Sequence, residues 1–218
     1  MKSFDQFEFT GILVPGVIAL YGLARMFPNT VGFVGDKGIS VGDLGLFVVL
    51  AYAAGHLVQA IGNLIEVIFW RIRGGMPTDW VRNKDRTYLS TEQTPALEER
   101  VSLLYPNAPI KTIADRSEKD WGGLTKQIYA IVQAAGRTRR VDIFNGNYGM
   151  FRGIAAALIV CMAGAAFSEY STPGYLILFG ALAVLALFRM NRFAIHYARE
   201  LFIQFVSLDT STFQKGKP

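Results

Sequence analysis

Apolar and charged positions are strongly segregated along this chain of 218 residues. Four stretches are mostly apolar and contain no charged side chain, namely residues 9–24, 44–65, 153–168 and 174–188. A helix needs about 20 such residues to cross the hydrocarbon core of a bilayer. The second stretch has this length alone, and the other three reach it if flanking arginines place their guanidinium groups among the lipid headgroups. These arginines are Arg25, Arg152 and Arg189.

The pattern therefore predicts an all-α, polytopic membrane protein with four transmembrane helices and a small helical insert. Residues 1–70 would hold the first two transmembrane helices and a short outer loop at 28–42. Residues 71–142 would form a cytoplasmic helical insert, and residues 143–218 a transmembrane hairpin. In the alternative interpretation, the third and fourth apolar stretches are buried helices of a soluble core or a re-entrant hairpin.

Helix signals recur after residue 71. In the insert, Thr94 is a candidate N-cap with Pro95 at the first helical position, and a second helix is predicted to begin at Ser117 and end at Gly136. The apolar stripe predicted for this second helix consists of Trp121, Leu124, Ile128, Ile131 and Ala135. The last predicted helix, residues 174–208, would measure about 50 Å at 1.5 Å per residue. It should therefore project from the membrane into the cytoplasm.

The distribution of basic residues predicts the orientation in the membrane. Fourteen lysines and arginines fall between residues 71 and 152, and five more follow from residue 189 onward. Because short loops rich in positive charge stay on the cytoplasmic side, we expect both termini and the insert to be cytoplasmic in an inner (plasma) membrane. Residues 22–24 resemble a signal-peptidase site, but Asp5 and Glu8 place acid where such peptides are basic, so we expect no cleavage.

One polar stripe interrupts the second apolar stretch. Its members are separated by four, three, four and three positions, which places them on one side of a helix. They are Tyr52, His56, Gln59, Asn63 and Glu66. In the structural interpretation, the stripe forms hydrogen bonds between helices. In the functional interpretation, it forms a path for protons, ions or lipid headgroups, with His56 as the titratable member and Glu66 at the cytoplasmic mouth.

Arginines also cluster near the predicted cytoplasmic ends of the third and fourth transmembrane helices. A basic belt of Arg137, Arg139, Arg140, Arg189, Arg192 and Arg199 could contact anionic lipid headgroups or a phosphate-bearing ligand. The simpler interpretation is that these residues only set topology. The formal net charge of +5 is assigned to topology first, and no specific nucleic-acid binding is predicted.

Two further features concern helix packing. Small residues recur at every fourth position in the third transmembrane helix, at Gly153, Ala157, Cys161 and Ala165, and predict close approach of the fourth helix or of a second subunit. Pro15 predicts a kink in the first helix because proline removes an interior hydrogen bond. Cys161 is the only cysteine, so no intramolecular disulfide is possible, and we expect it to be a packing residue.

Sequence motifs for catalysis and cofactor binding are lacking, and we predict no cofactor, metal or catalytic residue. The leading hypothesis is an oligomeric membrane effector or channel-like assembly that responds to a cytosolic signal or partner. The alternative is a membrane anchor or scaffold that recruits a cytosolic protein. A weaker alternative is a lipid-modifying intramembrane enzyme that uses His56 and Glu66.

Overall fold

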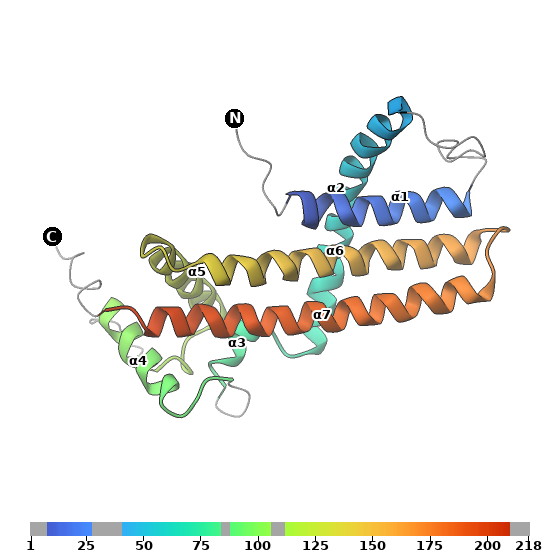
Figure 1. Ribbon diagram of the computed structural model, residues 1–218. Coiled ribbons are helices and arrows are strands. Elements are labelled where there is room, and N and C mark those ends of the chain that lie inside the picture. The colour runs from blue at the N-terminus through green and yellow to red at the C-terminus, as the bar shows by residue number, and fades with distance from the viewer. Residues whose placement is uncertain (1–7, 28–40, 84–87, 106–111, 210–218) are drawn as a thin grey trace. The chain divides into compact units, whose positions relative to one another are not determined.

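The computed structural model describes residues 8–27, 41–83, 88–105 and 112–209, and every regular element within these ranges is helical (Figure 1). Four of the helices are long and apolar enough to cross a membrane, which confirms this part of the predicted fold class. Most of the predicted outer loop, at 28–40, lies outside the described residues. The elements are η1 (Glu8–Leu13, a π-helical segment), α1 (Val14–Met26), α2 (Val41–Ile72), α3 (Pro77–Trp80), α4 (Gln93–Leu104), α5 (Glu118–Ala134), α6 (Arg139–Phe167) and α7 (Pro173–Val206).

Local capping signals explain where the shorter helices begin and end. Ser117 precedes α5 as predicted, and its hydroxyl accepts a hydrogen bond from the backbone N–H of Asp120 at 3.1 Å. Gly136 follows the same helix with φ of 71°, a left-handed conformation that glycine adopts without steric cost.

The predicted N-cap of α4 was wrong, because the helix begins before Thr94. Ser90 and Gln93 cap it reciprocally: the Ser90 hydroxyl accepts from the Gln93 N–H at 3.2 Å, and the Gln93 side chain accepts from the Ser90 N–H at 3.0 Å. Glu92 then directly precedes the first helical residue, Gln93. These reciprocal bonds have the pattern of a capping box, placed in the turn just before the helix, in which a serine and a glutamine three residues later satisfy each other's backbone N–H groups.

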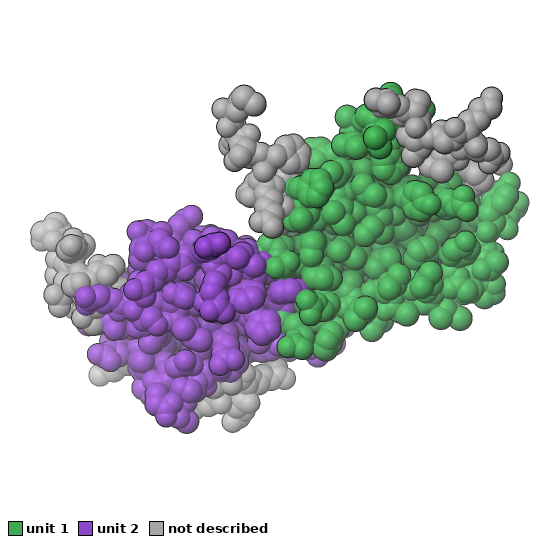
Figure 2. Space-filling model, viewed as in Figure 1, with its two compact units in different colours: residues 1–69, 146–192 green, residues 70–145, 193–218 purple. Residues whose placement is uncertain are grey.

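The described chain forms two compact units (Figure 2). Unit 1 consists of residues 1–69 and 146–192, and unit 2 consists of residues 70–145 and 193–218. Helices α2, α6 and α7 contribute residues to both units, whereas α1 belongs to unit 1 and α3, α4 and α5 belong to unit 2. Each unit has its own apolar core.

In unit 1, α1, α6 and α7 run alongside one another, and α2 crosses them (Figure 1). At the crossing, the backbones of the two helices can approach closely because glycines on each helix lie against the backbone of the other. A Cβ on Gly16 would collide with the Ala51 carbonyl oxygen, and a Cβ on Gly55 with the Ile12 carbonyl oxygen. With 32 residues, α2 is about 48 Å long.

The predicted small-residue stripe of α6, at Gly153, Ala157, Cys161 and Ala165, is buried, and α1 contacts it along its length. Gly153 faces Pro15, the Cys161 sulfur lies 3.6 Å from the Ile18 carbonyl oxygen, and Ala165 packs with Met26. The sequence had left the fourth helix and a second subunit as candidate partners of this stripe. The structure instead places the first helix against this stripe. The surface that η1 and α1 turn toward α6 contains glycine, so the two helices fit closely.

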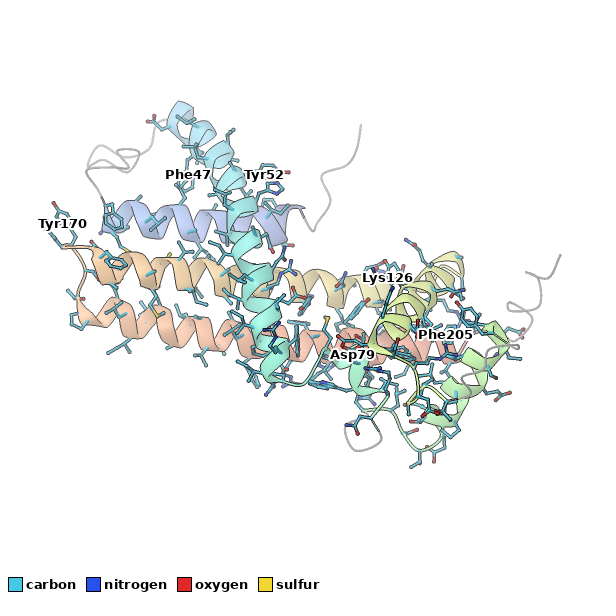
Figure 3. All side chains as sticks on the ribbon, turned by 180° about the vertical axis from the view of Figure 1, so that it is seen from behind. Phe47, Tyr52, Asp79, Lys126, Tyr170 and Phe205 are labelled. Atoms are coloured by element: carbon cyan, nitrogen blue, oxygen red, sulfur yellow. The ribbon has the colours of Figure 1, made fainter. Side chains whose placement is uncertain are left out.

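The core of unit 2 is built around α5 and the C-terminal part of α7. Trp121 is fully buried, its ring stacks on Phe202 with centroids 5.7 Å apart, and its indole N–H donates to the Thr78 carbonyl oxygen at 2.8 Å. The buried face of α5 differs slightly from the predicted stripe, since Val132 is fully buried and Ala135 is exposed. Figure 3 labels three residues of this unit, namely Asp79, Lys126 and Phe205.

Candidate functional site

The strongest cluster of polar groups in unit 1 is centred on Arg152 of α6. One terminal nitrogen of its guanidinium donates to the Glu66 carboxylate, and the other donates to Gln59 Oε1 at 3.0 Å. The side chains of Arg152 and Glu66 are only 18% and 19% exposed. Tyr148 lies beneath the guanidinium, with its ring centroid 5.9 Å from Cζ. The planar guanidinium thus joins two members of the predicted polar stripe on α2 to α6.

Gln59 connects three segments through its amide group. Its Nε2 donates to the Gly11 carbonyl oxygen in η1 and to the Gly149 carbonyl oxygen of α6, the latter at 3.3 Å. In a regular α-helix, the carbonyl of residue 11 would accept the N–H of residue 15. Residue 15 is Pro15, which has no N–H to donate. The Gln59 amide therefore supplies a donor next to the point where proline removes one.

The rest of the stripe is arranged differently. Tyr52 projects from α2 (Figure 3), and its ring contacts that of His56 edge-on with centroids 4.8 Å apart. His56 and Asn63 are both exposed. The structure therefore brings Gln59 and Glu66 together at Arg152 and leaves His56 and Asn63 outside this cluster.

Helix geometry explains why one stripe has two environments. At about 100° per residue, the five side chains spread over about 80° of the helix circumference. The buried face of α2 consists of Ala51, Gly55, Val58 and Gly62 and lies to one side of the stripe. Gln59 and Glu66 occupy the edge of the stripe nearest this face, whereas His56 and Asn63 occupy the opposite edge.

Beyond that opposite edge, α2 presents a continuous exposed face. Its members recur at spacings of four and three and are all exposed: Val49, Ala53, His56, Ala60, Asn63 and Val67. We call this set the α2 outer face. The spacing is that of the two seam positions of a heptad repeat, with alanines that allow close approach and two polar residues one heptad apart.

The six arginines of the predicted basic belt belong to both units. In unit 1, Arg192 is exposed, and the Arg189 guanidinium lies 5.5 Å from the ring centroid of Phe151. In unit 2, Arg139 and Arg199 are exposed. The remaining two belong to unit 2 as well: Arg140 pairs with Glu200 at 3.5 Å, and Arg137 donates to the Ser207 carbonyl oxygen at 3.1 Å. Part of the predicted belt thus has partners within the protein.

Unit 2 also contains perturbed tyrosines. The Tyr129 hydroxyl donates to the Asp142 carboxylate at 2.7 Å, and this bond raises the pKa of Tyr129 from 10.0 to about 12, with desolvation adding to the shift. Burial raises the pKa of the Tyr88 phenol well above its usual value. Both groups are protonated at neutral pH. They can donate hydrogen bonds there, but they do not act as bases.

Sequence analysis missed Arg152 as a member of the site, because it was interpreted as a headgroup-level residue at the end of a transmembrane helix. It is instead residue 14 of the 29 in α6. Within the described ranges, no group of three or more histidine, cysteine, aspartate or glutamate residues is placed to hold a metal ion. Cys161 is buried in unit 1.

Comparisons with protein-family models, with curated proteins and with solved structures found no match to this chain. The class of this protein is therefore assigned from its own helical architecture. The described chain is all-helical, with four helices long and apolar enough to cross a membrane.

Proposed function

We propose that this protein is a multi-pass inner-membrane effector that assembles into channel-like homo-oligomers through the α2 outer face. The observation that carries the proposal is the exposure of His56 and Asn63 on a face of α2 whose other members are apolar. Polar side chains facing lipid are costly, and they are usually directed toward other helices or a water-filled cavity. A second copy of the same face offers His56 and Asn63 suitable partners.

The α2 outer face is suited to such an assembly. Ala53 and Ala60 allow helices to approach closely, and His56 and Asn63 follow the same seven-residue period. In a ring of α2 helices, these polar side chains would line the centre, and Val49 and Val67 would extend the contact on either side. The Arg152 cluster supports the other edge of the stripe, because it fixes α2 against α6 within each protomer.

Unit 2 is the proposed receiver of the cytosolic signal. It has a core of its own, and α2, α6 and α7 each continue from unit 1 into it. Helices are stiff, so a partner that reorients them in unit 2 can shift α2 in unit 1. The predicted orientation, with both termini and the insert in the cytoplasm, belongs to this proposal.

Ion flux through liposomes tests the assembly. Wild-type protein and an Asn63→Leu variant would be reconstituted at equal density, and their ion flux would be compared. We expect wild-type flux and its loss in the variant. Leucine is the more apolar residue, so insertion into the bilayer is retained, and Ile68→Ala on another exposed part of α2 serves as the matched control.

Chemical crosslinking in the same liposomes separates the possible outcomes. The proposal is supported if the wild type forms oligomers and conducts ions, and if Asn63→Leu loses both the oligomers and the flux. Oligomers and flux that persist in Asn63→Leu contradict it. No flux from the wild type, with or without cytosolic extract, would favour the alternative of a scaffold that recruits a cytosolic partner through unit 2.

A further inference from the structure

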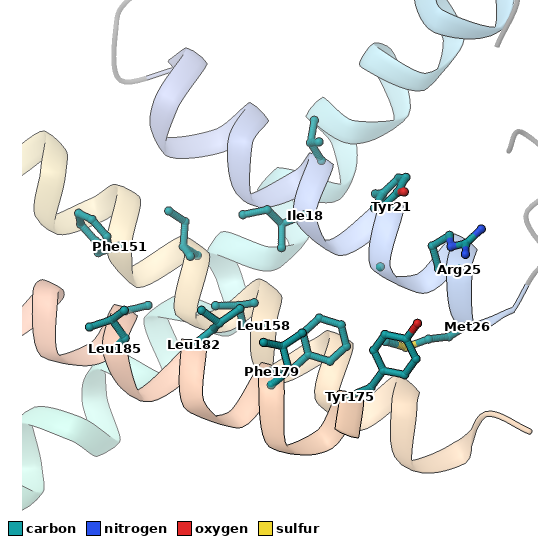
Figure 4. A pocket seen from close by; sticks show the side chains of 15 residues that line it. Ile18, Tyr21, Arg25, Met26, Phe151, Leu158, Tyr175, Phe179, Leu182 and Leu185 are labelled. Atoms are coloured by element: carbon teal, nitrogen blue, oxygen red, sulfur yellow. The ribbon is translucent and has the colours of Figure 1, made fainter. Parts of the chain in front are cut away.

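A long groove runs between α1, α6 and α7 within unit 1, on residues that the assembly proposed above does not use. Its volume is about 680 Å³, which is within the usual range of small-molecule sites. Figure 4 shows Phe151 and Leu185 at one end and Arg25, Tyr21 and Tyr175 at the other. We call it the α1–α7 groove.

Apolar side chains line almost all of the α1–α7 groove. Ile18 of α1, Leu158 of α6 and Phe179 and Leu182 of α7 form much of its length. Gly22 also lines it, and a Cβ at this position would collide with the Cys161 sulfur, so the glycine lets α1 approach α6 closely beside the groove. Such a surface does not hold water well, because water in a cavity needs polar partners. Beside a bilayer, hydrocarbon chains are the abundant molecules that match it.

The polar groups of the groove are gathered at one end. Arg25 lies in the last turn of α1 and is exposed, and Tyr21, one turn earlier, is also exposed. Tyr175, near the start of α7, brings a second phenol to the same end (Figure 4). Within the described part of the chain, no carboxylate lies within ion-pair distance of Arg25. Among the described residues, the guanidinium thus has no carboxylate partner.

We propose that the α1–α7 groove binds an anionic phospholipid, with one acyl chain along the groove and the phosphate on Arg25. A guanidinium fits a phosphate through two parallel charge-assisted hydrogen bonds, and the two tyrosine hydroxyls add donors at the same end. Arg25 follows directly after the apolar part of α1, so its charge stands at headgroup depth when that helix spans the bilayer. The apolar length of the groove thus matches the acyl chain of a phospholipid, and the polar end with Arg25 matches its phosphate.

Native mass spectrometry of the full-length protein tests this assignment. Protein in detergent would be titrated with phosphatidylglycerol or with phosphatidylcholine, and the fraction carrying bound lipid would be measured. We expect Arg25→Met to weaken phosphatidylglycerol binding about tenfold through the lost charge-assisted contacts. Arg71→Met removes an exposed arginine at the end of α2 and should leave binding unchanged.

A second variant tests the acyl-chain part of the groove. Leu182→Trp fills the groove with a larger side chain on an exposed part of α7, so it should weaken the binding of both lipids. Inorganic phosphate added in excess should not displace the lipid, because it lacks the acyl chain. Equal losses in Arg25→Met and Arg71→Met, or a Leu182→Trp variant that binds both lipids as the wild type does, would overturn the proposal. These variants leave the α2 outer face intact, so failure here is distinguishable from failure of the proposed assembly.

Discussion

Replacing Arg152 with methionine is the sharpest test of the cluster that joins α2 to α6. The change would leave the Glu66 carboxylate, 19% exposed, without its cation and would leave Gln59 Oε1 without the donor at 3.0 Å. Removing one partner of a buried ion pair costs about 3–5 kcal/mol, because the remaining charge stays buried and unpaired. This pair is partly buried, so we expect Arg152→Met, and separately Glu66→Leu, to lower the free energy of unfolding by up to this amount.

The double variant Glu66→Leu with Arg152→Met should recover most of that loss. Both charges are then absent, and buried ion pairs replaced by apolar residues of similar volume are often neutral in stability. The remaining cost is the unsatisfied Gln59 acceptor, about 1–3 kcal/mol. Reversible unfolding in mixed micelles with increasing dodecyl sulfate measures all four proteins. A coupling energy of at least about 2 kcal/mol is expected from this double-mutant cycle.

Additive single effects would refute this account of the cluster. The same conclusion would follow if Arg152→Met cost no more than Arg71→Met, which alters an exposed arginine. Arg152→Lys is a useful further comparison. A single ammonium group cannot reproduce the fork that reaches Glu66 and Gln59 together, so it should restore only part of the stability.

Two predictions concern unit 2. Trp121→Ala should lower the free energy of unfolding by about 3–5 kcal/mol, because the fully buried indole leaves a cavity beside Phe202, and thermal melts followed by near-ultraviolet circular dichroism would show it. A shift no larger than that of Trp121→Phe would contradict the packing described. Tyr129 should deprotonate late, because its pKa is about 12 rather than 10.0. A raised folded-state pKa stabilises the fold fully below about pH 10, and this contribution is lost as the pH rises to about 12. Phenolate absorbance in an alkaline titration should lose a component near pH 12 in Tyr129→Phe, and an unchanged profile would count against the Asp142 hydrogen bond.

The long helices could be predicted from the sequence because their signal is strong. Long apolar stretches without charge are rare outside membrane helices, and the four stretches fall within η1 and α1, α2, α6 and α7, with only Ser168 beyond the end of its helix. Ser117 and Gly136 were equally informative, since each acts through local backbone chemistry. Ser90 carried a capping-box signal with Gln93 that was overlooked in favour of Thr94 beside a proline.

The arrangement of the polar stripe could not be predicted from its spacing alone. Its environment depends on which side of α2 is buried, and that side is determined by contacts with η1, α1 and α6. Gly55 and Gly62, seven residues apart, were the available signal for the buried face. Arg152 was missed for a related reason, because an arginine beside an apolar stretch was assigned to the lipid headgroups rather than to a partner on another helix.

The contact between Gln59 and η1 has a consequence for the evolution of this chain. Pro15 withholds a backbone N–H near Gly11, and the Gln59 amide donates to the Gly11 carbonyl oxygen. A chain with alanine at position 15 would supply that N–H from its own helix and would lose the need for an amide at position 59. Positions 15 and 59, far apart in the sequence, should therefore covary among homologues, with glutamine kept where proline is kept. A substitution tolerated at one of them would then depend on the residue inherited at the other.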